Sequence, residues 1–379
     1  MHKGAHRQLK RSGMSGFSKL MSILIDLPGN RLTRKHLFCI LALKAATVVA
    51  EEYDGGTHMA KGKRRKRENK LTRGQFWTLV ILSSILLAFV SLVTISSNMD
   101  KPFMLTWDEL FSLTGLSGKQ PLDTEMQVHV LDVGNADAIL VRNKGQNLLI
   151  DAGENDDGTD VVAYLRSHGV KKLDYVIATH PDADHIGGMD DVVKAMNIGT
   201  FIMAFMPEGY TPTSKTYADM LEAISRKGVR ITPAQPGKQY SLGDAVIDIL
   251  GPVADFTETN NQSVVCRISF GDKRFLFMGD AEKEAERALM ESGVDLSADV
   301  LKVGHHGSKS STQSEFVKLV SPVYAVISCG ENNSYKHPHP DTLDTLDKWK
   351  IRCYRTDRDG TVVITTDGRS LTFETEKGE

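Results

Sequence analysis

The sequence THPDADHIGG occupies residues 179–188 and directly follows the apolar segment LDYVIA at 173–178. Four side chains that can bind a metal ion lie within six residues of this stretch: His180, Asp182, Asp184 and His185. A loop can point His180 and Asp182 one way and Asp184 and His185 another, which suits two adjacent cations. The Gly-Gly pair that follows lets the backbone turn tightly before the next helix.

The residues of this motif disfavour a purely structural role and two common types of metal site. An Asp-rich turn can simply cap the following helix, but two histidines that bracket two aspartates disfavour that interpretation. An EF-hand is excluded because its ligand ladder and terminal Glu are missing. The four cysteines are widely separated and form no Cys-x-x-Cys pair, which excludes a zinc ribbon.

Matching side chains follow three other apolar segments. Asp280 lies in FLFMGDAE, His305 and His306 lie in VLKVGHHGS, and His337 and His339 lie in YKHPHP. Each alone is an ordinary helix cap or surface residue. Together they predict a shared site at the strand ends, where loop-borne sites in α/β architectures lie. A carboxylate such as Asp280 can bridge two cations with its two oxygens.

Short apolar strands alternate with helical stretches over residues 126–379, with hairpin stretches at both ends. This alternation predicts an α/β fold in which a mixed sheet sandwich is covered by helices. The chain of 379 residues is 25% charged and 41% hydrophobic, which excludes collagen-like, coiled-coil, disordered and polytopic membrane proteins.

From about Met126 to the C-terminus, the chain resembles the metallo-β-lactamase fold. Within that fold it is similar to the extracellular hydrolase domain of the competence protein ComEC and its stand-alone relatives. The resemblance rests on seven segments: DVGNADAILV (132–141), NLLIDAG (147–153), THPDADHIGG, NNQSVV (260–265), FMGDAE (277–282), LKVGHHGS (301–308) and SYKHPHP (334–340).

The resemblance implies a four-layer αββα sandwich with a dinuclear metal site. Its implied metal ligands are His180, Asp182, Asp184, His185 and Asp280, with His305 or His306 nearby. The candidate catalytic residues are Asp184, Asp280, His305 and His306. Residues expected to contact substrate or to support the site are Asp132, Asp137, Asp151, Asn261, Ser263, Ser308 and His337.

Two departures from the superfamily pattern bear on the metal. Asp182 occupies the position of the second histidine, as in ComEC-like members, and Asn261 and Ser263 stand where the next histidine ligand would fall. Oxygen ligands in place of imidazole shift the preference from Zn²⁺ towards Mn²⁺ or another hard divalent ion. A smaller departure is DVGNADA where relatives have DVGQGDA.

A membrane anchor is predicted at residues 76–97, which contain no charge and are long enough to cross a hydrocarbon core of about 30 Å. Eight Lys and Arg residues between 61 and 73 are opposed only by Glu68. By the positive-inside rule, the N-terminus is cytoplasmic and the hydrolase domain is extracytoplasmic. A cleaved signal peptide is the alternative, disfavoured by the length of the run.

The expected organisation has five parts. Residues 1–58 form a poorly structured extension, interpreted as a product of start-site misassignment because Met59 resembles a natural start. A basic cytoplasmic arm (59–75), the anchor (76–97), a tether (98–125) and the hydrolase domain (126–379) follow.

The function predicted from the sequence is a membrane-anchored, extracytoplasmic, metal-dependent hydrolase with two divalent ions, Mn²⁺ or Zn²⁺. Two such ions favour a phosphodiester substrate, here DNA, with His305, His306 or His337 as candidate proton donors. The alternatives are hydrolysis of a small or cell-envelope ester and a non-catalytic, metal-stabilised binding domain. With one predicted span, a role in DNA transport would require a separate channel protein.

Charge weighs against a broad DNA-binding face. Residues 1–100 hold 17 of the 46 Lys and Arg but only 6 of the 48 Asp and Glu, which leaves 29 basic and 42 acidic residues for 101–379. Phosphate contacts require basic side chains. The candidates for a local patch are Lys302, Lys309, Lys336, Arg352, Arg355 and Arg358.

Overall fold

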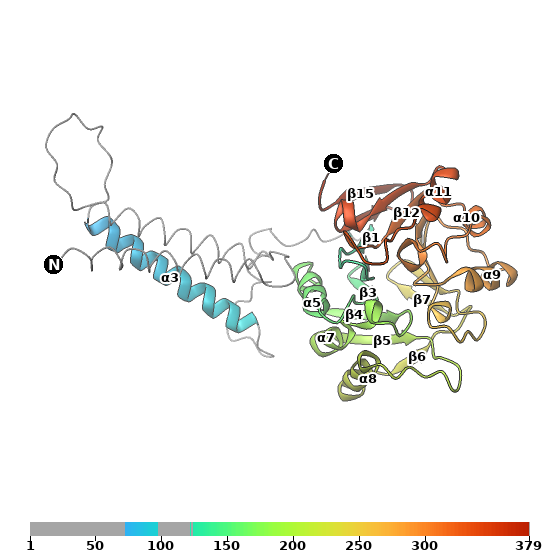
Figure 1. The fold of residues 1–379 in the computed structure, drawn as a ribbon. Helices are drawn as coiled ribbons and strands as arrows, with labels where there is room; N and C mark the ends of the chain where they lie inside the picture. The colour runs from blue at the N-terminus through green and yellow to red at the C-terminus, as the bar shows by residue number, and fades with distance from the viewer. Residues whose placement is uncertain (1–72, 98–121, 123, 379) are drawn as a thin grey trace, which may run out of the picture. The chain divides into compact units, whose positions relative to one another are not determined.

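The computed structural model describes residues 73–97, 122 and 124–378 (Figure 1). The chain divides into two units, residues 1–107 and 108–379. In the first unit, α3 (Arg73–Ser97) is helical over the run predicted to cross a membrane. Within the described residues, however, no helix combines the length and apolar character that a membrane crossing requires. The anchor therefore stays a prediction, and the extension, most of the basic arm and most of the tether lie outside the described residues.

Two sheets form the second unit, and both mix parallel and antiparallel pairs. The first sheet contains, in spatial order, β15 (Leu371–Thr375), β14 (Val362–Thr366), β1 (Met126–Val130), β2 (Ile139–Asn143), β3 (Gln146–Ile150), β4 (Lys172–Ala178), β5 (Asn197–Met203) and β6 (Ile231–Pro233). The second contains β13 (Arg352–Arg355), β12 (Tyr324–Ile327), β11 (Val300–Lys302), β10 (Lys273–Phe277), β9 (Cys266–Phe270), β8 (Ala245–Ile249) and β7 (Gln239–Leu242). Strands β3 to β6 run parallel, as do β10 to β13.

Alternating side chains on these strands build three apolar cores. In β4, Val176 packs towards the helices and Ile177 packs between the sheets; in β10, Phe275 packs between the sheets and Leu276 packs outward. This period of two is why both faces of each sheet are buried. The predicted αββα sandwich with two sheets is confirmed.

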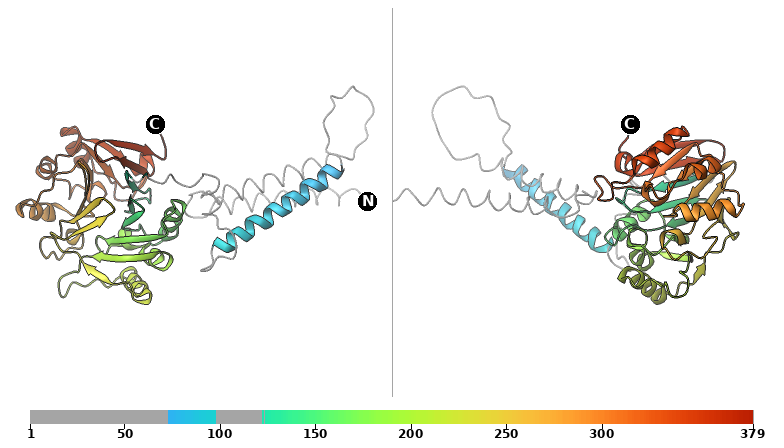
Figure 2. Two further views of the ribbon diagram at one scale, coloured as in Figure 1. Left: turned by 180° about the vertical axis from the view of Figure 1, so that it is seen from behind. Right: turned by 45° about the vertical axis from the view of Figure 1, so that its right-hand side comes forward.

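Helices cover the two outer faces, as Figures 1 and 2 show. The helices on the first sheet are α5 (Gly158–Ser167), α7 (Met189–Ala195) and α8 (Lys215–Lys227), and those on the second are α9 (Lys283–Glu291), α10 (Ser314–Val320) and α11 (Pro340–Lys348). Short helical turns lie in the loops: α6 (Ala183–Ile186), η2 (Asn260–Gln262), η3 (Gly304–Gly307) and α12 (Thr356–Asp359).

Candidate metal centre

The predicted ligands come together where parallel strands end. The loop after β4 carries His180 to His185, Asp280 follows β10, and His305 and His306 follow β11. Because β10 and β11 are parallel neighbours, their carboxyl ends lie at one edge of the second sheet. The two sheets thus contribute side chains from segments about 100 residues apart in sequence.

One group of donor atoms surrounds the Oδ1 oxygen of Asp280. His185 Nε2 lies 3.1 Å from it and His306 Nε2 lies 3.6 Å from it. Asp184 joins this group, because its Oδ2 is 3.4 Å from His306 Nε2. The ligand atoms of these four residues all lie within 4.8 Å of one another, which suits a single cation.

A second group faces the other oxygen of the same carboxylate. His180 Nε2 lies 4.0 Å from Asp280 Oδ2 and 3.8 Å from Asp182 Oδ2. His305 Nε2 is 3.7 Å from Asp280 Oδ2. Asp280 therefore stands between two sets of donors and presents one oxygen to each.

Several of these atoms are buried without a hydrogen-bond partner among the described residues. They are His180 Nε2, His185 Nε2, Asp280 Oδ1 and His306 Nε2. Buried polar atoms are normally hydrogen-bonded, and leaving one unpaired costs about 1–3 kcal/mol. Unpaired nitrogens and a carboxylate oxygen that converge on one point fit a divalent metal ion, so this His/Asp cluster can hold one.

The backs of the histidine rings are hydrogen-bonded so that each Nε2 faces the cluster. His306 Nδ1 donates to the carbonyl oxygen of Ser328 at 3.0 Å, and His185 Nδ1 donates to Asp151 Oδ2 at 2.7 Å. A ring that donates through Nδ1 keeps the lone pair of Nε2 for a metal.

Although burial alone would lower the pKa of His185 and His306, Asp280 raises both, so a bound cation would replace a proton on these rings. Burial alone would raise the pKa of Asp280, but His185 and His306 hold that pKa well below its usual range. Burial also opposes ionisation of Asp184, yet the nearby His306 lowers its pKa to about 2. His180 is neutral, because burial lowers its pKa to about 4.

Asp151 lies fully buried beneath the cluster. Besides His185, its carboxylate accepts hydrogen bonds from the backbone nitrogen of Thr179 at 2.8 Å and from Thr179 Oγ1 at 2.7 Å. Its φ of 58° is uncommon for a residue other than glycine. Three hydrogen bonds to one carboxylate thus fix the start of the metal-binding loop.

Asp137 supports the site from the other side. Its backbone nitrogen donates to the carbonyl oxygen of Asp184 at 3.0 Å, and its Oδ1 is 3.8 Å from His306 Nδ1. Lys302 Nζ pairs with Asp137 Oδ2 at 2.9 Å, and both side chains are only 2% exposed. Lys302 therefore neutralises a buried carboxylate, and its predicted place in a surface patch is wrong.

His305 and His306 adopt an unusual backbone. Their φ angles are 49° and 51°, in the left-handed region that costs a non-glycine residue of order 1–3 kcal/mol. The strain turns both rings towards Asp280, although they are adjacent in sequence. His306 is fully buried, whereas the side chain of His305 is 23% exposed.

Glu282 is a site residue that the sequence pattern did not predict. Its Oε1 accepts a hydrogen bond from His305 Nδ1 at 2.9 Å and one from Ser310 Oγ at 2.8 Å. The signal was present in FMGDAE, two residues after Asp280, but a Glu just before a helix is ordinarily attributed to the helix dipole.

Three of the predicted residues support the backbone around the cluster or lie beside it. Ser263 Oγ accepts a hydrogen bond from the backbone nitrogen of Asp280 at 3.1 Å, and so fixes that ligand. Asn261 Oδ1 accepts from the backbone nitrogens of Glu282 and Ala285 at the start of α9. Neither residue takes the place of the absent histidine ligand. Ser308 Oγ contacts Ser310 Oγ at 2.9 Å.

The last two predicted residues differ in their distance from the cluster. Asp132 Oδ2 is 3.6 Å from Lys377 Nζ, and Asp132 does not belong to the His/Asp cluster. His337 is 8% exposed and lies beside His305, with ring centroids 5.5 Å apart. His337 is therefore placed to influence the chemistry of the site.

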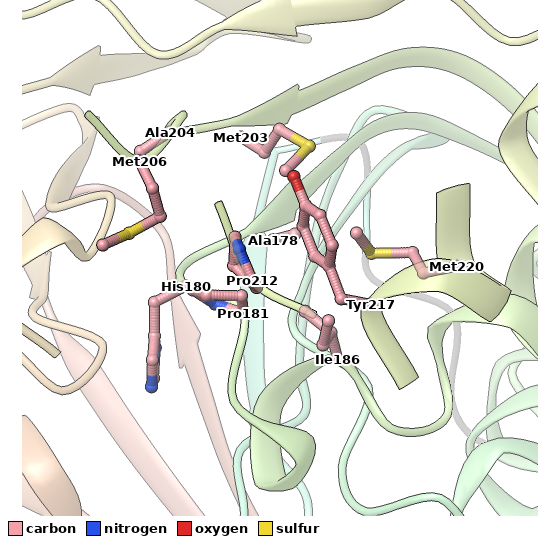
Figure 3. A pocket seen from close by; sticks show the side chains of 10 residues that line it. All are labelled: Ala178, His180, Pro181, Ile186, Met203, Ala204, Met206, Pro212, Tyr217 and Met220. Atoms are coloured by element: carbon pink, nitrogen blue, oxygen red, sulfur yellow. The ribbon is translucent and has the colours of Figure 1, made fainter. Parts of the chain in front are cut away.

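An open cleft of ≈ 390 Å³ lies over the cluster and is lined by Asp182 and Asp184. Glu154, Thr259 and Tyr335 also line it. Behind His180 lies a separate apolar pocket, formed with Met203, Tyr217 and Met220 among others (Figure 3). Its volume of ≈ 10 Å³ is far too small for an organic substrate.

The predicted basic patch is reduced to a few residues. Lys302 is buried, and Arg355 forms an ion pair with Asp357 at 2.6 Å, so neither contributes a free positive charge to the patch. Lys309 and Lys336 are exposed on the segments that carry His306 and His337.

Comparison with known proteins agrees with this geometry. Residues 131–331 match the sequence model of the metallo-beta-lactamase superfamily. The chain is 34% identical over 271 residues to ComE operon protein 3 of Bacillus subtilis, a match that covers 66% of this chain and 34% of that protein. It is 32% identical over 240 residues to competence protein ComA of Neisseria gonorrhoeae, which covers 63% and 32%.

The chain spans about a third of the length of these curated relatives. Among solved structures, the metallo-beta-lactamase fold protein YhfI from Bacillus subtilis matches with a TM-score of 0.40 and 13% identity, over 61% of this chain and 95% of that one. The chain belongs to the metallo-β-lactamase superfamily and is a hydrolase-fold relative of ComEC-type competence proteins.

Proposed function

We propose that the chain is a phosphodiesterase that cleaves DNA with two divalent cations. The observation that carries the proposal is Asp280, whose Oδ1 faces the buried, unpaired Nε2 atoms of His185 and His306 and whose Oδ2 faces that of His180. Asp184, His185 and His306 belong to one group, and His180 and Asp182 belong to the other. A carboxylate donor at Asp182, in place of imidazole, favours a hard ion such as Mn²⁺.

The chemistry follows from the charges of the site. The residues on the two sides of Asp280 would hold the cations, which would supply an activated water molecule and neutralise the negative charge of a phosphodiester. Asp184 lines the cleft and orients the attacking water. His305, oriented by Glu282 through Nδ1, donates a proton to the leaving oxygen, a role worth about 10²–10⁴-fold in rate.

The cleft fits a polymer better than a small ester. It is open, and its lining is polar and acidic, with Glu154, Asp182 and Asp184. These carboxylates repel a phosphate unless cations neutralise them, so binding of a phosphodiester depends on metal. A small apolar ester would need a closed apolar pocket, and the one behind His180 holds about one water molecule.

The proposal includes a location. Ile81, Ile85, Phe89 and Leu92 of α3 are exposed apolar side chains, each at least 39% accessible. We propose that α3 anchors the chain in the cell membrane, with the basic arm cytoplasmic and the hydrolase domain outside. The name of the Neisseria gonorrhoeae relative connects it to competence, which supports DNA as the substrate. Transport of DNA would then require a separate channel protein.

Hydrolysis of linear single- and double-stranded DNA tests the function. Purified full-length protein in detergent is assayed with Mn²⁺, with Zn²⁺ or with chelator, beside Asp184→Ala. Cleavage that requires the cation and is lost in the variant is expected. Absence of cleavage by a folded, metal-loaded protein would instead favour an envelope ester or a binding role.

A further inference from the structure

Tyr335 stands at the rim of the cleft. It lines the same cleft as Asp182 and Asp184, and it is 66% exposed despite its large aromatic ring. Its ring lies nearly parallel to that of His337, with centroids 5.6 Å apart and 21° between the planes. His337 lies nearly parallel to His306, at 6.2 Å and 18°. Three rings therefore run from the buried cluster to the surface of the cleft.

The loop that carries Tyr335 is held by its own side chains. Asn333 Nδ2 donates to the carbonyl oxygens of Gly330 at 2.9 Å and His337 at 2.6 Å, while Asn333 Oδ1 accepts from the backbone nitrogen of His337 at 2.9 Å. Lys336 has a φ of 61°, in the left-handed region. A ring presented by a braced loop loses little conformational entropy when a ligand binds.

We propose that Tyr335 stacks on an unpaired nucleobase of the substrate, so that the site prefers single-stranded DNA or frayed ends to intact duplex. This inference rests on the proposed function. Aromatic rings beside nucleic-acid grooves bind bases by stacking, which tolerates any sequence because every base has a flat face. Bases inside a duplex already stack on each other and cannot reach the ring.

Two exposed lysines near Tyr335 can contact the phosphates that flank the stacked base. Lys336 is the next residue in the chain and is exposed. Lys309 is also exposed, and its backbone nitrogen donates to His339 Nδ1 at 3.1 Å, which holds it beside the loop that carries Tyr335. The cleft thus offers one flat ring in its lining, and the segments beside that ring carry two exposed positive charges.

The test compares kcat/KM on three substrates with Mn²⁺ and the full-length protein. These are a single strand, the same strand with abasic sites around the cleaved bond, and a duplex. Tyr335→Ala is expected to lower kcat/KM on the single strand by about 5- to 150-fold. The same variant should leave kcat/KM on the abasic strand unchanged. Tyr335→Phe keeps the aromatic ring and should have the kcat/KM of the parent protein on the single strand. Metal content equal to that of the parent shows that the variant is folded.

Tyr210→Ala is the matched control, because Tyr210 is a comparably exposed tyrosine, at 53%, outside the cleft lining. An equal loss in that variant, or an equal loss on the abasic strand, would overturn the assignment. Full activity of Tyr335→Ala on the single strand would overturn it while leaving the proposed function intact. If the parent protein cleaves none of the three substrates, the proposed function fails together with the inference.

Discussion

Asp151 accepts three hydrogen bonds at the base of the cluster, and one of them orients His185. We predict that Asp151→Asn weakens cation affinity by about 10- to 100-fold, the usual cost of removing the partner of a metal-binding histidine. Asparagine tolerates the left-handed backbone of residue 151, so the fold should persist. Titration of chelated protein with Mn²⁺ measures the change.

Asp132→Asn is the control for this prediction, because Asp132 was also predicted from the sequence yet faces Lys377. Its affinity for Mn²⁺ should equal that of the wild type. Equal affinity in Asp151→Asn would show that the carboxylate does not support the metal.

His305 and His306 are adjacent but differ in burial, and we predict different roles for them. His306→Ala should lose bound cation, because His306 Nε2 lies between Asp184 and Asp280. His305→Ala should keep its cation content and lose about 10²–10⁴-fold in kcat, as expected for a proton donor. Metal analysis and kinetics on both variants decide the matter; loss of metal from His305→Ala would make that residue a ligand.

Single residues were predictable from the sequence where their chemistry is unusual. Four potential ligands within six residues rarely serve a purely structural role, so the loop at 180–185 was identifiable. Glu282 and Lys302 were not, because each is equally compatible with an ordinary surface charge. Their roles depend on tertiary neighbours, His305 and Asp137, that no local pattern specifies.

At the scale of elements, the metal-binding loop packs against the segment that follows β3. Gly187 and Gly188 have φ angles of −55° and −83°, so left-handed conformations do not account for the glycines. A Cβ on Gly187 would lie 2.2 Å from the backbone nitrogen of Asn155, and one on Gly188 would lie 2.4 Å from the carbonyl oxygen of Ala152. The pair allows close approach of two backbones, which corrects the expectation of a glycine-dependent turn.

We therefore predict that Gly188→Ala displaces the loop and lowers the free energy of unfolding by about 1–3 kcal/mol, with weaker binding of Mn²⁺. Gly228→Ala, at the left-handed end of α8, has no atom within 4 Å of its new Cβ. Backbone strain should lower the free energy of unfolding of this variant by about 1–2 kcal/mol, and its affinity for Mn²⁺ should not change. Denaturant unfolding and Mn²⁺ titration separate the two; unchanged affinity in Gly188→Ala would count against this packing.

Glu286 on α9 accepts hydrogen bonds from the backbone nitrogens of Thr312 and Gln313, ahead of α10. Burial raises the pKa of Glu286 to about 7 in the folded protein. The pKa of Glu286 in the unfolded chain is near 4.5, so between pH 4.5 and pH 7 the folded state keeps a proton on Glu286 that the unfolded state has lost. The free energy of unfolding therefore falls as the pH rises from about 4.5 to about 7.

The prediction is that Glu286→Gln gains stability relative to the wild type by up to about 3 kcal/mol between pH 5 and pH 8. Denaturant unfolding in chelator measures the difference at each pH. The exposed Glu284→Gln should follow the wild type throughout. A constant difference between Glu286→Gln and wild type would contradict the raised pKa.

Elements with a strong apolar pattern were predictable, and short edge elements were not. Strands β4 and β10 lie where the apolar runs LDYVIA and FLFM predict. Strands β6 and β7 were missed, because Ile231–Pro233 has three residues and Gln239–Leu242 is mostly polar. Both lie at the edges of the sheets and become strands only through pairing with a neighbour.

At the scale of the whole molecule, the acidic character of residues 101–379 fits a cation-dependent enzyme. Aspartates from both sheets converge on the cluster, and each needs a counter-charge that Lys302 alone does not supply. The proposed use of metal ions therefore accounts for the acidic net charge, for the arrangement of the donor atoms and for the binding of phosphate.

The most direct test of this account is a titration of chelated, full-length protein with Mn²⁺ that follows bound metal and DNA cleavage together, beside Asp280→Ala. The account predicts two bound ions per chain, cleavage that rises with occupancy, and loss of both in the variant. A single bound ion in the wild type, or DNA cleavage that persists without metal, would contradict it.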